Sequence, residues 1–221
     1  MTSALDPRML DRIVEGLALT HQKLLEVVDG LSAEQFAEPS LLPGWSRSTL
    51  LGHLTMNARS FVHLMTCAAR GEVGEQYPGG QAARTAGIEE AAAWDPARAV
   101  SELRKAIYTL EGAWAGATSD IWQGTGTMSG GSTSPMHDLP FRRWRECVVH
   151  LTDLNVGIGY NEWPDYYVRL ELDRQKMAWA ASHPMGLTQF PKEVMQLPEK
   201  QRLAWLLQRE TVDGLPLGPG L

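Results

Sequence analysis

The sequence has only two cysteines, no excess of basic residues and no long apolar run. Cys67 and Cys147 lie far apart, so they form no disulfide scaffold, and so few cysteines fit a reducing cytoplasm. The net charge is −6, with 20 Lys and Arg against 26 Asp and Glu, and the basic residues are scattered. This charge balance lacks the basic surface of a nucleic-acid-binding protein.

Membrane and secretory signals are also missing. No apolar run approaches the length of a membrane span, and the start, Met-Thr-Ser-Ala-Leu-Asp-Pro-Arg, has no apolar core of a signal peptide. The 221 residues are 43% hydrophobic and 21% charged, which is typical of a globular protein with one medium domain and a small appendage. We therefore expect a cytoplasmic protein, either a monomer or a homodimer, that contacts neither membrane nor nucleic acid.

Helical periodicity dominates the first 160 residues. Apolar side chains recur at helical spacing in four segments, at about residues 13–31, 46–70, 95–114 and 140–157. Ser46 is a good N-cap, Asp95 followed by Pro96 is a typical helix start, and Gly71 marks a helix end. Four long helices joined by loops predict a mainly α protein, an antiparallel four-helix bundle.

The segments between these helices have weaker patterns. Residues 71–94 are rich in Gly and Ala and are predicted to be mostly loop, with a short helix near 88–93. Residues 116–137 are rich in Gly, Ser and Thr, and a loop of this length is usually functional or flexible. A short hairpin could turn at Gly130 and Gly131.

After residue 160 the sequence becomes rich in proline. Helices are predicted at about 165–182 and 199–210, and the last residues are predicted to be extended. We therefore expect a bundle of residues 1–160 and a small appendage, α or α/β, of residues 161–221.

Three side chains on two predicted helices are candidates for metal ligands. Glu146 and His150 are four residues apart and therefore share one helix face. The pair alone favours a solvated face, but His53 lies among leucines on another helix, and bundles build metal sites from inward side chains of facing helices. Two imidazoles, a carboxylate and a water make an open zinc site, and iron, manganese or nickel accept the same ligands. We expect a divalent metal, with zinc preferred.

The neighbouring polar residues have plainer interpretations. A lone histidine among leucines is more often a hydrogen-bonded core residue than a ligand. Asp153, three residues beyond His150, either orients that ligand or is a solvated acid, and Cys147 is predicted to pack rather than react. Surface positions are predicted for the other four histidines: His21, His63, His137 and His183.

Two stretches of sequence resemble a known family. Pro-Gly-Trp-Ser-Arg-Ser at 43–48, with Leu-Leu-Gly-His-Leu at 50–54, resembles the start of the second helix of the DinB-like superfamily. Arg-Trp-Arg-Glu-Cys-Val-Val-His-Leu-Thr-Asp-Leu at 143–154 is similar to the fourth helix of its thiol-dependent maleylpyruvate isomerases, best known in a mycothiol-dependent form. The resemblance implies a DinB-like four-helix bundle that holds zinc through His53, Glu146 and His150.

The resemblance also implies catalytic residues. Leu-Ala-Trp-Leu-Leu-Gln-Arg at 203–209 is similar to a family segment that ends Gly-Arg, so Arg209 would be the family's arginine, although Gln208 replaces the glycine. Arg84 resembles a second family arginine, and Asn57 has a polar counterpart. The family's appendage is an α/β unit with clear strands, whereas this one has no convincing strand, which leaves the thiol-binding surface undefined.

The activity that the resemblance implies is isomerisation of maleylpyruvate to fumarylpyruvate in gentisate breakdown. A thiol cosubstrate, mycothiol or glutathione, adds to the alkene, and the resulting single bond rotates before the thiol leaves. A coordinated thiol is deprotonated, and arginine forks suit the two carboxylates of the substrate. Two alternatives stay open: a metal-dependent thiol S-transferase acting on a small electrophile, and a non-enzymatic bundle with a vestigial metal site.

Overall fold

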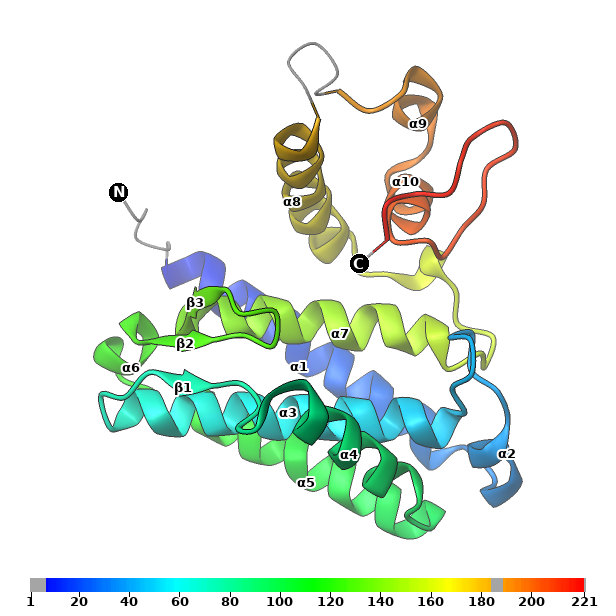
Figure 1. Cartoon of the computed structure of the whole chain (residues 1–221). Coiled ribbons are helices and arrows are strands. Elements are labelled where there is room, and N and C mark those ends of the chain that lie inside the picture. The colour runs from blue at the N-terminus through cyan, green and yellow to red at the C-terminus, as the bar shows by residue number, and fades with distance from the viewer. Residues whose placement is uncertain (1–6, 184–188, 221) are drawn as a thin grey trace. The chain divides into compact units, whose positions relative to one another are not determined.

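The chain forms two compact units, residues 1–156 and residues 157–221, in the computed structural model (Figure 1). The structure describes residues 7–183 and 189–220. No helix within these residues combines the length and the apolar character needed to cross a membrane.

The first unit is a four-helix bundle made of α1 (Pro7–Asp29), α3 (Arg47–Ala69), α5 (Pro96–Ala115) and α7 (Leu139–Asp153). In Figure 1, α1 and α7 run in one direction and α3 and α5 in the other. A hydrogen bond between His21 and Glu111 at 2.8 Å and an ion pair of Asp29 with Arg104 at 2.6 Å align α1 against α5 in antiparallel register. The mainly α four-helix bundle expected from the sequence is confirmed.

The bundle helices begin and end at residues that satisfy their free backbone groups. The Ser46 hydroxyl accepts a hydrogen bond from the Thr49 amide at 3.1 Å, and Asp95 accepts one from the Arg98 amide at 2.9 Å. Such N-caps stabilise a helix by about 1 kcal/mol. Gly71, with φ of +71°, follows the end of α3 in a conformation that favours glycine. The predicted boundaries of α3 and α5 are correct to within one residue, whereas α1 begins six residues before the predicted segment and α7 ends four residues before its predicted end.

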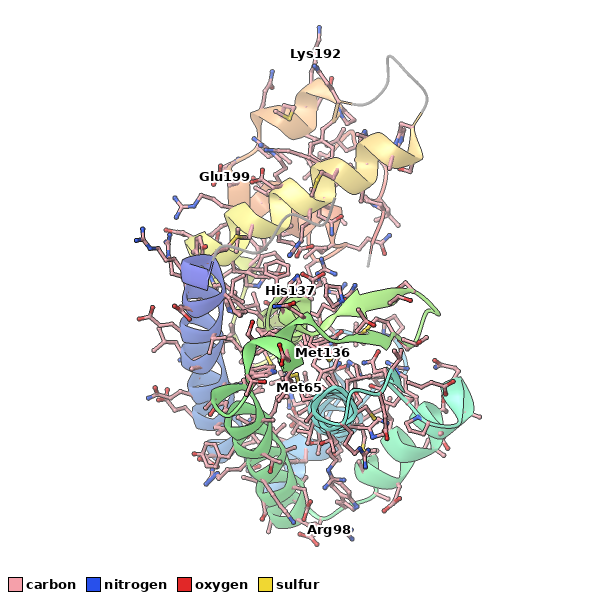
Figure 2. The ribbon with its side chains drawn as sticks, turned by 90° about the vertical axis from the view of Figure 1, so that its left-hand side faces the viewer. Met65, Arg98, Met136, His137, Lys192 and Glu199 are labelled. Atoms are coloured by element: carbon pink, nitrogen blue, oxygen red, sulfur yellow. The ribbon has the colours of Figure 1, made fainter. Side chains whose placement is uncertain are left out.

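Close packing around Trp144 joins α7 to α1. The indole of Trp144 is buried and donates a hydrogen bond from Nε1 to the Thr20 hydroxyl at 2.8 Å. A Cβ atom at Gly16 would lie only 2.5 Å from this ring, so glycine is required for the contact. Met65 and Met136, labelled in Figure 2, are also buried in this unit. The bundle core is therefore tightly packed where α7 meets α1.

Short elements cover one side of the bundle. Strands β1 (Gly74–Glu75), β2 (Thr125–Thr127) and β3 (Thr133–Pro135) form a sheet in the order β1-β2-β3. β1 pairs with β2 in parallel, and β2 pairs with β3 in antiparallel register. Gly131, with φ of +80°, lies in the turn between β2 and β3, which confirms the predicted hairpin. The unit also contains α6 (Ser119–Gln123) and the 3-10 helix η1 (Met136–Asp138) near the sheet, and α2 (Ala33–Ala37) at the other end of the bundle (Figure 1).

The prediction for residues 71–94 was wrong in extent, because a helix, α4 (Gly80–Ala92), occupies much of this segment. Only Ile88 and Ala91 of α4 are buried, so the apolar stripe is too narrow to give a periodic signal. The helix packs closely on α3 at Gly52, where a Cβ atom would lie 3.0 Å from the Ala91 Cβ. The contact that stabilises α4 is therefore tertiary.

The second unit contains η2 (Tyr160–Glu162), α8 (Asp165–Ser182), α9 (Lys192–Gln196) and α10 (Glu199–Leu206). The described residues of this unit include no strand, so the appendage is α within them. α10 ends earlier than predicted because Gln208 adopts φ of +58° and the Arg209 amide donates to the Ala204 carbonyl at 2.7 Å. This is the helix-ending position where glycine is usual. Gln208 therefore adopts a conformation that glycine usually provides.

Candidate metal centre

The three predicted ligands, His53, Glu146 and His150, come together inside the bundle. His53 Nε2 lies 2.8 Å from Glu146 Oε2, and His150 Nε2 lies 3.3 Å from the same oxygen. One ligand atom from each residue lies within 4.8 Å of the others, and this is the one such group found among the described residues. Both histidines are buried, while Glu146 is partly exposed.

Antiparallel pairing of α3 and α7 produces this arrangement. His53 on α3 faces Glu146 and His150 on α7, and one turn further along α3, Asn57 faces Arg143, one turn earlier on α7. The apolar residues beside each of these side chains pack into the bundle. Two polar stripes, each with helical spacing, therefore meet along one helix interface.

The donor set fits a divalent metal ion. Three protein ligands with one open position are typical of catalytic zinc, and ligands about 2.0–2.2 Å from a tetrahedral ion lie about 3.3 Å apart. The observed separations of 2.8 Å and 3.3 Å from Glu146 are close to this value. Only small side-chain adjustments would bring His53 and His150 to an ion shared with Glu146.

The protonation states of the cluster follow from its burial and its hydrogen bonds. Burial alone would raise the pKa of Glu146, but hydrogen bonds from His150 and His53 outweigh it and hold the pKa well below the usual range. Burial lowers the pKa of His53 despite its hydrogen bond with Glu146. The cluster therefore presents a carboxylate and a neutral imidazole near neutral pH, which is the form that binds metal.

Asp153 binds the ring nitrogen of His150 that lies away from Glu146. His150 Nδ1 lies 2.8 Å from Asp153 Oδ2, and Asp153 is 1% exposed. Burial opposes protonation of His150, but the hydrogen bonds with Asp153 and Glu146 outweigh it and raise the pKa of the imidazole. Because both ring nitrogens face carboxylate oxygens, the protonated ring donates to both. A metal ion would replace the proton on Nε2 while Asp153 kept the ring in place.

Arg84 and Tyr77 lie on the α4 side of the cluster. Arg84 Nη2 donates to His53 Nδ1 at 3.3 Å, because a guanidinium group has no acceptor. The Arg84 guanidinium also lies over the Tyr77 ring, 5.9 Å from its centroid. Sequence reasoning found Arg84 through the family resemblance but missed Tyr77, which precedes a helix that the periodicity did not reveal.

A buried network lies next to the cluster on the α1 side. The fully buried Arg143 donates to the Leu54 carbonyl at 2.8 Å, to Asn57 Oδ1 at 2.9 Å and to His21 Nε2 at 3.2 Å. His21 is 1% exposed and pairs with Glu111, so the prediction of a surface histidine was wrong. The residues that bury it come from α5 and α7, which sequence spacing on α1 does not show. Asn57, the predicted catalytic amide, uses its oxygen in this network.

The thiols of the protein are not suited to act as nucleophiles. Burial raises the pKa of Cys147 to about 11, so this side chain stays protonated. Cys67 is also buried, with His63 Nε2 3.6 Å from its sulfur. The buried position of Cys147 agrees with the expectation that this side chain packs.

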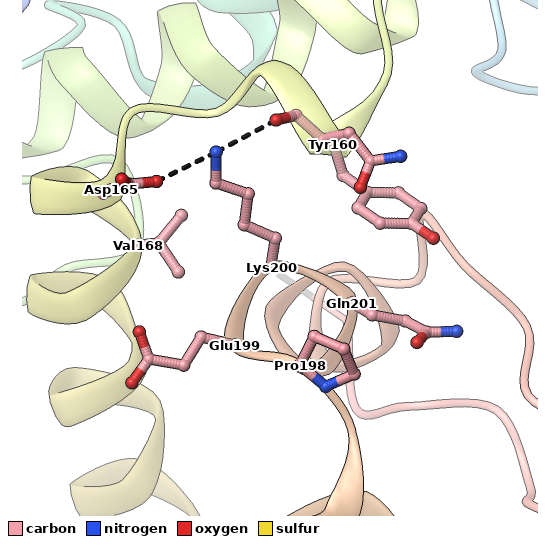
Figure 3. Close-up of a pocket in the computed structure, with 8 residues that line it drawn as sticks. Tyr160, Asp165, Val168, Pro198, Glu199, Lys200 and Gln201 are labelled. Carbon is pink, nitrogen blue, oxygen red and sulfur yellow. Dashed lines mark hydrogen bonds and ion pairs between the residues drawn. The ribbon is translucent and has the colours of Figure 1, made fainter.

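Arg209 belongs to the second unit, where its guanidinium donates to the Leu207 carbonyl at 2.7 Å. Figure 3 shows a pocket of this unit between η2, α8 and α10. Lys200 projects into it and is held by Asp165 and by the Asn161 carbonyl, both at 2.9 Å. The charge of Lys200 is therefore already paired within its own unit.

The fold and the ligand cluster define a DinB-like four-helix bundle with a candidate metal centre, and comparison with known proteins identifies its family. The mycothiol maleylpyruvate isomerase N-terminal domain family matches residues 17–155. The chain therefore belongs to this family of enzymes. No curated protein matches the sequence.

Solved structures share the fold. The crystal structure of the mycothiol-dependent maleylpyruvate isomerase is 24% identical with a TM-score of 0.73, over 78% of this chain and 71% of that chain. A histidine-to-alanine mutant of that isomerase gives the same values. YfiT from Bacillus subtilis, described as a probable metal-dependent hydrolase with an unusual four-helix bundle topology, is 15% identical with a TM-score of 0.57, over 70% and 90% of the two chains.

Proposed function

We propose that the protein is a metal-dependent and thiol-dependent cis-trans isomerase that converts maleylpyruvate to fumarylpyruvate. The observation that carries the proposal is the cluster of His53, Glu146 and His150 inside a chain of the mycothiol maleylpyruvate isomerase family. A cis alkene does not rotate until its double bond is broken. Addition of a thiolate makes the bond single, and expulsion of the same thiolate after rotation restores the alkene in the trans form.

The cluster would hold the ion that this chemistry needs. Free thiols have pKa values of about 8.5 and are mostly protonated at neutral pH. A divalent ion bound by His53, Glu146 and His150 would supply a thiolate at neutral pH. Zinc is the proposed ion, since two imidazoles and a carboxylate are typical ligands for it. Mycothiol is the proposed cosubstrate because the family is named for it, with glutathione as the other candidate.

The substrate carboxylates need cationic partners. Arg84 lies beside His53 and is partly exposed, so its guanidinium can bind a carboxylate through two parallel hydrogen bonds. We assign this role to Arg84, and a role for Arg209 stays a prediction from the family resemblance. Asn57, one turn beyond His53 on α3, is the remaining proposed catalytic residue. Its side-chain oxygen is held by a hydrogen bond from Arg143.

The test is to follow the absorbance of maleylpyruvate with zinc-loaded protein and with mycothiol, glutathione or cysteine in turn. We expect turnover that needs both the metal and mycothiol, that a chelator abolishes and that added zinc restores. Mass spectrometry of the product separates two activities: fumarylpyruvate without sulfur supports the isomerase, whereas a product that retains the thiol identifies an S-transferase. Absence of any thiol-dependent product would refute the proposal.

A further inference from the structure

Tyr77 is the best-placed hydroxyl group beside the metal cluster that no role yet uses. Its side chain is 9% exposed and lies in the loop between β1 and α4. The Arg84 guanidinium, which lies over the Tyr77 ring 5.9 Å from its centroid, also donates to the ligand His53 at 3.3 Å. Ser60 and Glu146 are the other polar groups near the phenol. Tyr77 therefore lies beside Arg84, next to the ligand cluster.

The loop that carries Tyr77 is fixed on both sides. The preceding residue, Gln76, is buried, receives a hydrogen bond from the Ser129 amide at 3.0 Å, and donates to the Ser60 hydroxyl at 3.2 Å. The Tyr77 carbonyl accepts a hydrogen bond from the Gly80 amide at 2.8 Å. Because its loop is fixed, the Tyr77 side chain can meet a bound ligand with little loss of backbone entropy.

The direction of the hydrogen bonds makes the phenol a donor toward a ligand. Arg84 only donates, so any bond between the two uses the phenol oxygen as acceptor and leaves the phenol hydrogen free to donate. Burial raises the pKa of Tyr77, so the hydroxyl keeps its hydrogen at neutral pH. The phenol hydrogen is therefore available to a substrate oxygen bound beside Arg84.

We infer that Tyr77 is a further catalytic residue, whose hydroxyl donates a hydrogen bond to the ketone oxygen of the substrate as that oxygen becomes an enolate. The inference rests on the proposed function. The thiolate adds to the alkene carbon β to the ketone, and the alkene electron pair moves to give the C=C bond of the enolate and a negative ketone oxygen. Tyr77 stabilises this oxygen without transferring a proton while Arg84 binds the neighbouring carboxylate, and the electron pair returns when the thiolate leaves.

The test separates the hydroxyl from the ring. Tyr77→Phe keeps the aromatic surface under Arg84 and removes only the hydroxyl, whereas Tyr77→Leu removes both. Tyr108→Phe is the matched control, because Tyr108 lies on α5 with 58% exposure. With unchanged zinc content and circular dichroism, we expect kcat of Tyr77→Phe to fall by about 100-fold with KM nearly unchanged, and Tyr108→Phe to match the wild type.

Equilibrium binding gives a second readout that does not depend on turnover. Acetopyruvate, a 2,4-diketo acid without an alkene, forms an enolate like that of the addition intermediate, while maleate supplies only two carboxylates. Calorimetry with zinc-loaded Tyr77→Phe should show acetopyruvate binding weakened by about 10-fold or more and maleate binding changed less than about threefold.

The outcomes distinguish the two claims. Wild-type turnover with an equally active Tyr77→Phe variant would overturn the role of Tyr77 alone, and so would equal acetopyruvate binding by both proteins. A drop in activity that appears only in Tyr77→Leu would show that the ring supports Arg84 and that the hydroxyl does not act. A wild-type protein without turnover would overturn the proposed function itself.

Discussion

Removal of the Asp153 carboxylate tests how much this residue contributes to the metal affinity of the candidate centre. Asp153 does not belong to the ligand cluster, yet its Oδ2 lies 2.8 Å from His150 Nδ1 and its side chain is almost completely buried. Asp153→Asn keeps the size of the side chain and an oxygen that can accept from Nδ1–H, but it removes the charge. Asp153→Ala removes both the charge and the hydrogen bond.

The expected magnitude follows from these two losses. Partners of this kind contribute about 10- to 100-fold in metal affinity, which corresponds to about 1.4–2.7 kcal/mol. Since the hydrogen bond survives in Asp153→Asn, we expect about a 10-fold loss of zinc affinity there. Asp153→Ala also frees the His150 ring to rotate, so its loss should approach 100-fold.

The assay is competition for zinc against a chelator of known affinity at constant pH. Asp173→Asn on α8 is the control, because that carboxylate is exposed and belongs to the second unit. Far-ultraviolet circular dichroism would establish that each variant is folded. Zinc affinities within threefold of the wild type for both Asp153 variants would refute the reasoning, because His150 would then need no partner to bind the ion.

Three further predictions concern the ligands, the pH dependence of stability and the packing. His150→Ala should abolish stoichiometric zinc binding and leave helical circular dichroism largely intact; complete unfolding would show that the histidine is structural. Burial lowers the pKa of His21 from 6.5 to about 4, so the unfolded chain binds a proton that the folded chain does not between these values. This residue should therefore reduce the free energy of unfolding by about 3 kcal/mol as the pH falls from 6.5 to 4, and urea titrations of His21→Gln should show a smaller pH dependence in that window. Gly16→Ala should destabilise the protein by about 1–3 kcal/mol in the same titrations, because the new methyl group would meet the Trp144 ring at 2.5 Å; unchanged stability would mean that the ring shifts freely.

Local sequence was sufficient for the long helices. The caps at Ser46 and Asp95 act within their own first turns, and the apolar spacing of α3 and α7 depends only on helix geometry. The ligand pair Glu146 and His150 was predictable for the same reason, since residues four apart on a helix face the same way. His53 was predictable as their partner because a bundle brings polar residues on apolar helices together.

The tertiary structure alone decided the rest of the site. Helix α4 has almost no amphipathic pattern. Its packing against Gly52 brings Arg84 into contact with His53 and with the Tyr77 ring. His21 is buried because Glu111 and Arg143 approach it from two other helices. Residue spacing determines which side chains share a helix face. Contacts such as those of Arg84 with His53 and of Arg143 with His21, which are 31 and 122 positions apart, depend instead on how the faces pack, and that packing sets the surroundings of the metal centre.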